Sequence, residues 1–294
     1  MSDVDAVMIL AAGLGTRLRP LTDVVAKPMV PVGDRPAIAH VLARLRTLDA
    51  RVVVANVHHR PEDLAAWADG EGVAVSHEPI LLGTAGGLAK AESLLGAGSV
   101  LVWNGDILSD LDPRALVARH AAQETEATLA FAPADLHAGN VGLDRDGRIV
   151  RLRSVAFAAL GEEVASGFFL GIHVVGPRLR ADLPPAGCLV GDVYLPALAR
   201  GATLHGVAVT DGFRDVGDLA SYVAANRGWL AERGATWWTS PDADVGEVSV
   251  DGSIVGAGAV IRASCTQSIV WPGARVDVPT HRTIVTPQLR AEMP

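Results

Sequence analysis

The residues best suited to chemistry lie in a glycine-rich segment, residues 10–22, which is followed by Lys27-Pro28. Gly13 and Gly15 come directly after the apolar run 7–10, which predicts a buried strand. Glycine has no Cβ, so the backbone N–H groups of such a turn can approach a phosphate closely. Arg17 and Lys27 add two cations to the same loop. Together these residues predict a site that holds a triphosphate.

Two other phosphate-binding patterns do not fit this segment. A Rossmann fingerprint needs a third glycine where Leu18 stands, and Pro20 and Pro28 interrupt any helix within the loop. The Gly-Lys-Ser/Thr of a Walker A loop is absent. Gly13-x-Gly15 alone also fits a tight turn with solvated cations, because short glycine motifs match by chance. Chance is a poor explanation for the whole string, Gly-x-Gly-Thr-Arg-Leu-x-Pro-Leu-Thr with Lys-Pro five residues later.

The string resembles the signature of the sugar-1-phosphate nucleotidylyltransferases, also called NDP-sugar pyrophosphorylases. Further segments resemble other parts of that family in the right order, at 78–87, 102–106, 166–172 and 213–218. The mannose-1-phosphate guanylyltransferases and the N-acetylmuramate-1-phosphate uridylyltransferases are the most similar branches. The resemblance implies that a sugar 1-phosphate oxygen attacks the α-phosphorus of an NTP and releases pyrophosphate. Because that nucleophile is already ionised near neutral pH, positioning and charge stabilisation matter more than a general base.

The resemblance also implies roles for the two cations and for two carboxylates. Arg17 is expected to bind the β- and γ-phosphates, and Lys27 to stabilise the transition state at the α-phosphate. Asp106 and Asp215 are expected to hold Mg²⁺, which prefers oxygen ligands and takes few of them from the protein. Taken alone, Asp106 also fits a turn cap, and Asp215 fits the junction of a strand and a helix.

The remaining candidate residues frame the nucleotide and the sugar. Those expected at the base, ribose and phosphates are Leu10, Ala11, Ala12, Gly13, Gly15, Thr16, Glu78, Gly83 and Thr84. Asn104, Asn140 and Gly167 are the candidates for sugar contacts. Thr84 equally fits the N-cap of the helix that follows, since threonine is a favoured cap.

One region departs from the family pattern. Many relatives carry Glu-Lys-Pro before the strand at 166–172, and that lysine holds the sugar 1-phosphate, whereas residues 150–155 contain no lysine here. Arg151 or Arg153 is a candidate replacement, although arginine and lysine are not equivalent at a phosphate. The departure favours the muramate and mannose branches over the thymidylyl branch.

Two polar pairs invite other interpretations. Adjacent side chains on a strand point to opposite faces, so His58 and His59 cannot readily bind one ion and are assigned a structural or sugar-cleft role. Glu162 and Glu163 are predicted to lie on a solvated loop.

Strand-like and helix-like runs alternate through the first half of the chain, which predicts βαβ units with ligands at the carboxyl ends of the strands. The expected strands are 4–10, 51–57, 73–77, 99–104 and 126–132, and the expected helices are 37–48, 61–68, 85–95 and 113–121. Added strands follow at 142–143, 147–152, 164–174 and 203–209, with helices at 192–198 and 219–229. Asp218 is expected to cap the last helix. The fold class is therefore α/β, a Rossmann-like, mainly parallel mixed sheet of the nucleotide-diphospho-sugar transferase kind, with a catalytic domain over 1–232.

The last part of the chain changes character. Small and apolar residues recur every five or six positions between 248 and 278, which suggests turns of a β-helix. Members of the family carry left-handed hexapeptide β-helices at this end, so a partial left-handed β-helix-like extension is expected over 242–286. Trp237-Trp238 would then be an apolar plug, and the short extension a means of homo-oligomerisation.

Composition narrows the class of protein further. A net charge of −8 over 294 residues argues against a nucleic-acid partner, whose phosphates need a basic face. No apolar run approaches the ~20 residues of a membrane helix, and the acidic start Met-Ser-Asp-Val-Asp lacks the pattern of a signal peptide. Cys188 and Cys265 give neither a disulfide framework nor metal-ligand spacing, which indicates a cytoplasmic protein.

We therefore expect a Mg²⁺-dependent enzyme that joins an NTP and a sugar 1-phosphate and most resembles a GDP-mannose-forming transferase. The alternatives are a UDP-sugar-forming enzyme, acting on N-acetylmuramate 1-phosphate or a similar sugar, and a catalytically inactive regulatory homologue. A Rossmann oxidoreductase is disfavoured by the missing third glycine.

Overall fold

The structure is a computed structural model and describes residues 4–210 and 212–294. The chain divides into two compact units that do not follow chain order. One unit comprises Met1–Gly13 and Val41–Phe213, and the other comprises Leu14–His40 and Arg214–Pro294. The predicted catalytic domain 1–232 therefore draws on both units, and it stays a prediction. The first three residues, which belong to the acidic start Met-Ser-Asp-Val-Asp, lie outside the described residues.

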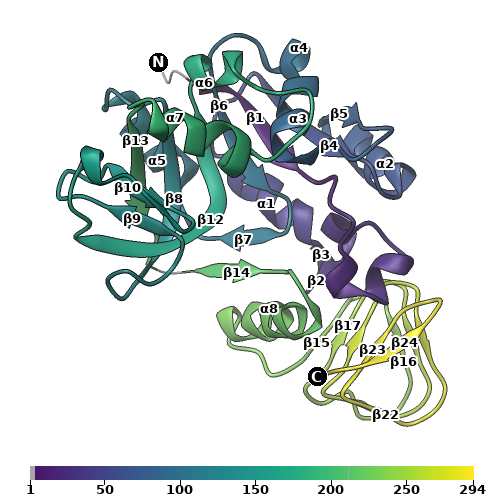
Figure 1. Ribbon diagram of the computed structural model, residues 1–294. Coiled ribbons are helices and arrows are strands. Elements are labelled where there is room, and N and C mark those ends of the chain that lie inside the picture. Colours follow the sequence, from purple (N-terminus) through teal and green to yellow (C-terminus); the bar gives the residue numbers. More distant parts are fainter. Residues whose placement is uncertain (1–3, 211) are drawn as a thin grey trace. The chain divides into compact units, whose positions relative to one another are not determined.

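The first unit is built on a four-stranded parallel sheet in the order β6-β1-β4-β5 (Figure 1). These strands are β1 (Val4–Leu10), β4 (Val52–Val57), β5 (Ala74–His77) and β6 (Ser99–Asn104). β-branched and apolar side chains suit a fully buried parallel strand, and β6 is buried from Ser99 to Trp103. The prediction of a parallel sheet in this part of the chain is confirmed.

Antiparallel strands extend this sheet into a mixed one beyond β6. The long strand β12 (Ala165–Val175) pairs with β6 and continues through β9 (Val141–Leu143), β10 (Ile149–Leu152) and β11 (Val155–Ala156). Strand β8 (Ala127–Ala134) also pairs with β12 and runs antiparallel to it. Strand β13 (Leu204–Ala208) pairs with β8 in the parallel direction. These strands correspond to those expected from 126–132, 142–143, 147–152, 164–174 and 203–209.

Helices of the first unit begin and end at recognisable signals. The helices are α2 (Pro61–Glu71), α3 (Gly83–Lys90), α4 (Glu92–Leu95), α5 (Pro113–Ala121), α6 (Pro177–Ala181) and α7 (Leu195–Ala199). Asp112 caps α5 by accepting the N–H of Arg114, and Pro113 occupies its first turn. The helix expected over 85–95 is instead two helices that meet at Ala91. The helix expected over 192–198 is a π-helix, Leu189–Tyr194, followed by α7, because Pro196 has no N–H to donate.

Two short elements, a 3-10 turn (Ala158–Leu160) and β7 (Ile107–Ser109), complete this part of the chain. Helix α1 (Ala37–Leu45) and strand β14 (Phe213–Asp215) each have residues in both units. Helix α1 ends before the predicted residue 48. None of the helices among the described residues is long and apolar enough to cross a bilayer.

The second unit gathers the signature loop, one long helix and the C-terminal strands. Three 3-10 turns, Thr16–Leu18, Leu21–Asp23 and Lys27–Met29, are followed by the hairpin of β2 (Pro31–Val32) and β3 (Arg35–Pro36). Helix α8 (Leu219–Glu232) begins with a capping box between Asp218 and Ser221, which confirms Asp218 as its N-cap.

Helix α8 connects the hairpin to the C-terminal strands. The Asn226 side chain accepts the N–H of Gly33 at 2.9 Å, and Trp229 lies where a Cβ at Gly33 would stand. From the same helix, the Tyr222 hydroxyl accepts a hydrogen bond from Trp271 Nε1 at 2.9 Å. The β2–β3 hairpin and the C-terminal strands therefore pack on one half-buried helix.

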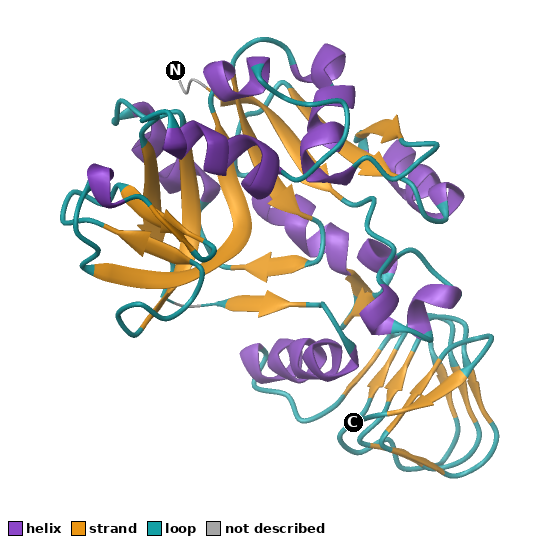
Figure 2. Cartoon of the chain, in the orientation of Figure 1, coloured by secondary structure: helices purple, strands orange, loops and turns teal. Residues whose placement is uncertain are grey.

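Three short parallel sheets form the C-terminal segment, as a β-helix-like extension requires (Figure 2). One sheet contains β15 (Trp238–Thr239), β17 (Ile254–Val255), β20 (Ile269–Val270), β23 (Thr283–Val285) and the antiparallel β24 (Arg290–Glu292). The others contain β16 (Asp244–Val245), β18 (Val260–Ile261) and β21 (Arg275–Val276), and β19 (Cys265–Thr266) with β22 (Thr280–His281). Ile254, Ile269 and Ile284 are register partners, so each of these coils takes 15 residues, or three of the five-residue units seen in the sequence. Trp238 packs edge-on against Trp229, whereas Trp237 is 49% exposed and does not act as a plug.

Candidate nucleotide and sugar site

The signature loop of the second unit closes around Gly15. This glycine has a φ of +64°, and a Cβ there would lie 2.7 Å from Thr22 Cγ2 and 3.0 Å from Lys27 Cβ. The Thr22 hydroxyl donates to the Gly15 carbonyl at 2.9 Å. The stem of Lys27 therefore packs directly on the turn, and a larger residue at position 15 would displace it.

Arg17 lies in the turn that follows Gly15, next to Thr16, and its side chain is exposed. The N–H and hydroxyl groups of Ser221 and the nearby charge of Arg17 lower the pKa of Asp218. The structure thus brings the two predicted catalytic cations to one glycine turn, beside the N-terminus of α8.

The strand-end part of the site lies in the first unit. Leu10 and Asn104 are register partners at the ends of β1 and β6, and the Gly105 N–H donates to the Leu10 carbonyl at 2.9 Å. Leu10 and Ala11 therefore lie beside Asn104 and Gly105, as expected where the carboxyl ends of neighbouring parallel strands meet. Asp106 is partly exposed there.

A buried side-chain pair that the sequence analysis missed holds the backbone at Ala11. The Asn56 side chain accepts the Ala11 N–H through Oδ1 at 2.7 Å and donates through Nδ2 to Glu78 Oε1 at 2.7 Å. Glu78 Oε2 accepts the N–H of Leu82 at 3.0 Å, and the residue is fully buried. Glu78 is thus a positioning residue for two backbone segments. The sequence signal that could have pointed to Asn56 is a polar amide inside an otherwise apolar strand.

The loop at Gly83 and Thr84 is held by the segment before the π-helix. A Cβ at Gly83, where φ is +74°, would lie 2.4 Å from the Gly187 carbonyl oxygen. Thr84 Oγ1 accepts the N–H of Leu189 at 2.8 Å, and the N-cap position of α3 is occupied by Leu82 instead. The N-cap alternative for Thr84 is therefore wrong, and its hydroxyl ties two loops together.

The three predicted sugar residues are all tied to β12. The Asn140 N–H donates to the Gly167 carbonyl at 2.8 Å, and Asn140 Oδ1 accepts the N–H of Phe169 at 2.7 Å. Asn104 lies against Gly171, where a Cβ would come within 2.3 Å of Asn104 Nδ2. The structure thus brings Asn140 and Gly167 together, whereas Asn104, at the end of β6, packs against a later residue of β12, Gly171.

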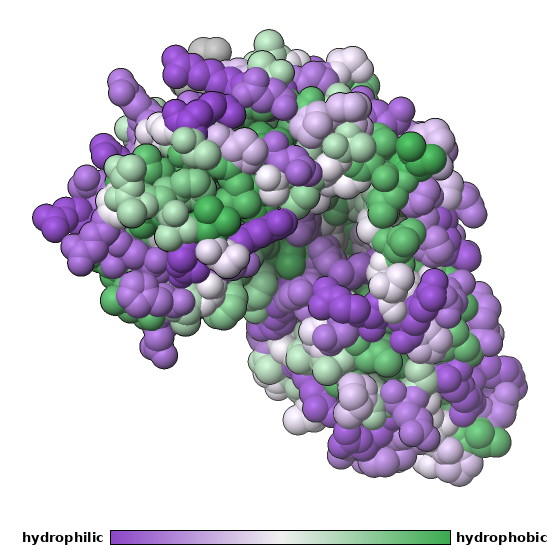
Figure 3. Space-filling view, in the orientation of Figure 1, coloured by the Kyte–Doolittle hydropathy of each residue, from purple (hydrophilic) through white to green (hydrophobic). Residues whose placement is uncertain are grey.

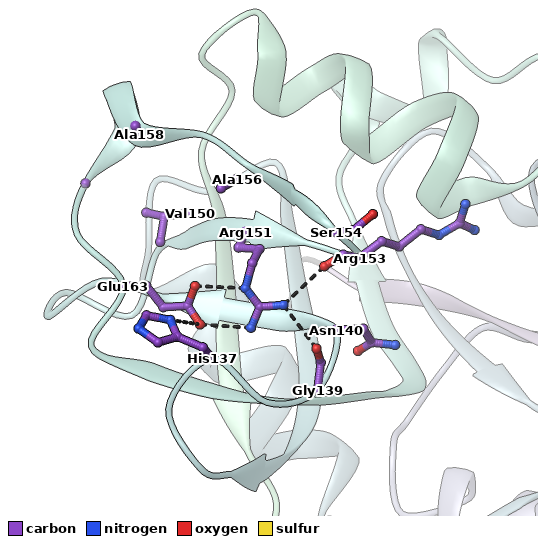
Figure 4. Close-up of a pocket in the computed structure, with 11 residues that line it drawn as sticks. His137, Gly139, Asn140, Val150, Arg151, Arg153, Ser154, Ala156, Ala158 and Glu163 are labelled. Carbon is purple, nitrogen blue, oxygen red and sulfur yellow. Dashed lines mark hydrogen bonds and ion pairs between the residues drawn. The ribbon is translucent and has the colours of Figure 1, made fainter.

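A cavity of about 680 Å³ lies beside Asn140 in the first unit (Figure 4). Its wall includes Arg151, whose guanidinium pairs with Glu163 at 2.8 Å, and both side chains are largely buried. Both glutamates lie on the loop before β12, and Glu162 is exposed as predicted. The prediction was wrong for the Glu163 side chain, which is not solvated because its carboxylate pairs with Arg151. Hydrogen bonds from Arg151 lower the pKa of the Glu163 carboxyl to about 2. Hydrophobic residues form a patch around the place labelled β10 in Figure 1 on the face that Figure 3 shows.

The two candidate replacements for the family's lysine have different surroundings. Arg151 is committed to Glu163 and to loop carbonyls, so it is poorly placed to take a phosphate. Arg153 extends away from that pair in Figure 4 and donates to Cys188 Sγ at 3.0 Å. Burial raises the pKa of the Cys188 thiol, but backbone N–H groups and the charge of Arg153 lower it overall. Of the two arginines, Arg153 is the better candidate for a phosphate contact.

The two predicted metal ligands belong to different units, Asp106 to the first and Asp215 to the second. Each carboxylate is partly exposed, and Gly217 leaves room for Asp215, since a Cβ there would lie 2.8 Å from Asp215 Oδ2. Within the part of the chain that the structure describes, no group of three or more His, Cys, Asp or Glu side chains is placed to hold a metal. Two carboxylates suffice for Mg²⁺ when phosphates and water supply its other ligands. His58 instead hydrogen-bonds the Glu78 carbonyl at 2.8 Å, which fits its predicted structural role.

A family model described as nucleotidyl transferase matches residues 6–232, and the chain belongs to this family. It is 28% identical to a mannose-1-phosphate guanylyltransferase of Mycobacterium tuberculosis, over 93% of this chain and 81% of that protein. It is 30% identical to an N-acetylmuramate alpha-1-phosphate uridylyltransferase of Caulobacter vibrioides, over 74% of this chain and 94% of that protein.

Among solved structures, HddC from Yersinia pseudotuberculosis complexed with GMP-PN superimposes with a TM-score of 0.62 at 20% identity, over 76% of this chain and 99% of that one. This likeness shows the fold. The chain spans 62–68% of the length of the eukaryotic mannose-1-phosphate guanylyltransferases that it also matches. The activity of those longer proteins is therefore carried to this chain only as a proposal.

Proposed function

We propose that this chain transfers a nucleoside monophosphate from an NTP to a sugar 1-phosphate, giving an NDP-sugar and pyrophosphate. An oxygen of the sugar 1-phosphate forms a bond to the α-phosphorus, and the bond from that phosphorus to the oxygen bridging to the β-phosphate breaks. The observation that carries the proposal is the packing of Lys27 on the Gly15 turn beside Arg17, in a chain that belongs to the nucleotidyl transferase family.

Charge stabilisation is the main task of the side chains in this reaction. Arg17 would bind the oxygens of the departing pyrophosphate through its planar guanidinium. Lys27 would face the α-phosphate, where negative charge builds up in the transition state. Backbone groups of residues 10–13, Gly15 and Thr16, with the loop at Gly83 and Thr84, would frame the base, ribose and phosphates, and Glu78 would support that frame.

Asp106 and Asp215 would hold Mg²⁺ through their carboxylate oxygens, the ligand type that this ion prefers. When bound, the ion would screen the repulsion between the phosphates of the two substrates. Asn104, Asn140 and Gly167 would contact the sugar, and Arg153 would take the place of the family's sugar-phosphate lysine.

The favoured substrates are GTP and mannose 1-phosphate. This choice is supported by the guanylyltransferase relatives. UTP with N-acetylmuramate 1-phosphate is the second candidate, favoured by the uridylyltransferase relative. An inactive regulatory homologue is the third, and the presence of Arg17, Lys27, Asp106 and Asp215 argues against it.

A substrate matrix tests the proposal. Each of GTP, UTP, ATP, CTP and dTTP is incubated with mannose, glucose and N-acetylmuramate 1-phosphates and Mg²⁺, and released pyrophosphate is measured. We expect the highest rate with GTP and mannose 1-phosphate, and a sharp loss of rate when the metal is chelated. Release that does not require a sugar 1-phosphate, or none with any pair, would contradict the proposed activity.

The C-terminal segment is the proposed contact for a homo-oligomer, since stacked coils gain stability from neighbours. Light scattering of the full chain, against a monomer mass of 30.5 kDa, tests this, and a monomer at all concentrations would contradict it.

A further inference from the structure

The loop between β8 and β9, residues 135–140, contains two residues in the left-handed region. His137 has a φ of +68° and Gly139 a φ of +73°. For a residue with a Cβ this conformation carries strain, so surrounding contacts must hold His137 in place. This loop ends at Asn140, a proposed sugar contact.

Arg151 reaches this loop from β10. Its Nη1 donates to the Gly139 carbonyl at 3.0 Å and to the Arg153 carbonyl at 3.1 Å. Its Nη2 lies 3.3 Å from the Ala138 carbonyl oxygen. A planar guanidinium can bridge several acceptors in fixed directions, so one side chain sets the position of the whole turn.

Glu163 and Ser166 link Arg151 to the other end of the loop, at His137, through hydrogen bonds. Glu163 accepts from Arg151 Nε and Nη2 at 2.8 Å each, and from the Ser166 hydroxyl at 2.5 Å. Ser166 Oγ in turn accepts the His137 N–H at 2.7 Å. The side chains of Arg151 and Glu163 are 13% and 10% exposed, so bulk water competes little with these bonds.

The chain makes room for this arrangement at Gly142, where a Cβ would lie 2.3 Å from the Glu163 carboxyl carbon. Ser166 directly precedes Gly167, whose carbonyl accepts the Asn140 N–H. One connected network therefore includes both residues proposed to contact the sugar.

We propose that Arg151, Glu163 and Ser166 are positioning residues that clamp loop 135–140 onto β12 and so preset Asn140 and Gly167 for the sugar 1-phosphate. The consequence for the sugar rests on the proposed function, whereas the clamping of the loop does not. Arg151 acts through the loop and touches no substrate.

The test uses the full chain with Glu163→Gln, which removes the charge at constant size. Hydrogen exchange followed by mass spectrometry should show segment 136–141 exchanging about tenfold faster, as expected when a charge-assisted bond is lost. With GTP and mannose 1-phosphate, or the pair that turns over fastest in the matrix, KM for the sugar should rise about tenfold. KM for the nucleotide should change less than about twofold.

Two further variants make the result specific. Arg151→Lys keeps a cation but not the planar fork, and should reproduce the faster exchange and the higher KM for the sugar. Glu92→Gln is the matched control, because Glu92 pairs with the buried Arg180 at 2.8 Å in the same unit. It should lower the melting temperature without changing KM for either substrate. If Glu163→Gln fails to fold, Ser166→Ala removes a single link of the same network.

The outcomes separate the two claims. Unchanged exchange in loop 135–140 would overturn the clamp whatever the activity. Faster exchange with an unchanged KM for the sugar would overturn its role in positioning. If wild-type protein turns over no pair, the proposed function fails, and the exchange measurement still decides whether the clamp exists.

Discussion

Glu78→Gln is the sharpest test of the buried support beneath the nucleotide loop. Both oxygens of Glu78 accept N–H bonds, from Asn56 Nδ2 at 2.7 Å and from Leu82 N at 3.0 Å. Asn56 cannot turn its own oxygen toward a new amide, because that oxygen already accepts the Ala11 N–H at 2.7 Å. The amide nitrogen of glutamine must then face one of two donors, and a buried polar group is left without a partner.

Leaving such a group unsatisfied costs ~1–3 kcal/mol of the free energy of unfolding. For a protein of this size, each ~1 kcal/mol lowers the melting temperature by about 2–4 °C. We therefore expect scanning calorimetry to show a fall of about 2–12 °C. Because Ala11 belongs to the proposed nucleotide frame, KM for the NTP should also rise while KM for the sugar changes little.

The matched control is Glu62→Gln, an exposed glutamate in the first turn of α2. A surface substitution of this kind stays within about 0.5 kcal/mol. If Glu78→Gln had the same melting temperature as Glu62→Gln, the argument that the glutamine amide must face another hydrogen-bond donor would be refuted.

Three further predictions address the other parts of the account. Lys27→Ala should lower kcat about 10²–10³-fold, ~2.7–4 kcal/mol of lost charge stabilisation, and a change in KM alone would contradict that role. Asp218→Ala removes the capping box of α8 and should cost ~0.5–2 kcal/mol in urea unfolding, so an unchanged midpoint would count against it. Because the pKa of Glu163 is lowered from 4.5 to about 2 in the folded protein, its ionised carboxylate stabilises the folded state above pH 4.5. This stabilisation is lost as the pH falls from 4.5 toward about 2. Wild type should therefore exceed Glu163→Gln in stability near pH 6 and lose that advantage below pH 3, whereas a constant difference over this range would show that the pair is not responsible.

Elements with strong local signals were predictable from the sequence. Strand Ser99–Asn104 and helix Pro113–Ala121 match their predicted bounds, since a buried apolar run defines one and Asp112-Pro113 begins the other. The cap at Asp218 followed from the same kind of local signal. The ends of β1 and β6 also met as expected, because neighbouring parallel strands share one edge.

What could not be predicted depends on partners that are distant in the chain. The hydrogen bond from Gly33 to Asn226 joins residues 193 positions apart and ties the β2–β3 hairpin to α8. Glu163 looked solvated because it lies on a loop and its partner Arg151 lies on β10, and the sequence gives no sign of their pairing. Glu78 was expected at the base, but only the structure shows that both of its oxygens are occupied.

The fate of the α-phosphate tests the central claim most directly. GTP labelled with ³²P at the α-position, and separately at the γ-position, is incubated with mannose 1-phosphate and Mg²⁺, with UTP and N-acetylmuramate 1-phosphate run alongside. The account predicts that α-label enters the sugar nucleotide and that γ-label leaves in pyrophosphate, in equal amounts. Transfer of γ-label to the sugar, or α-label recovered only in unreacted nucleotide with both pairs, would contradict it.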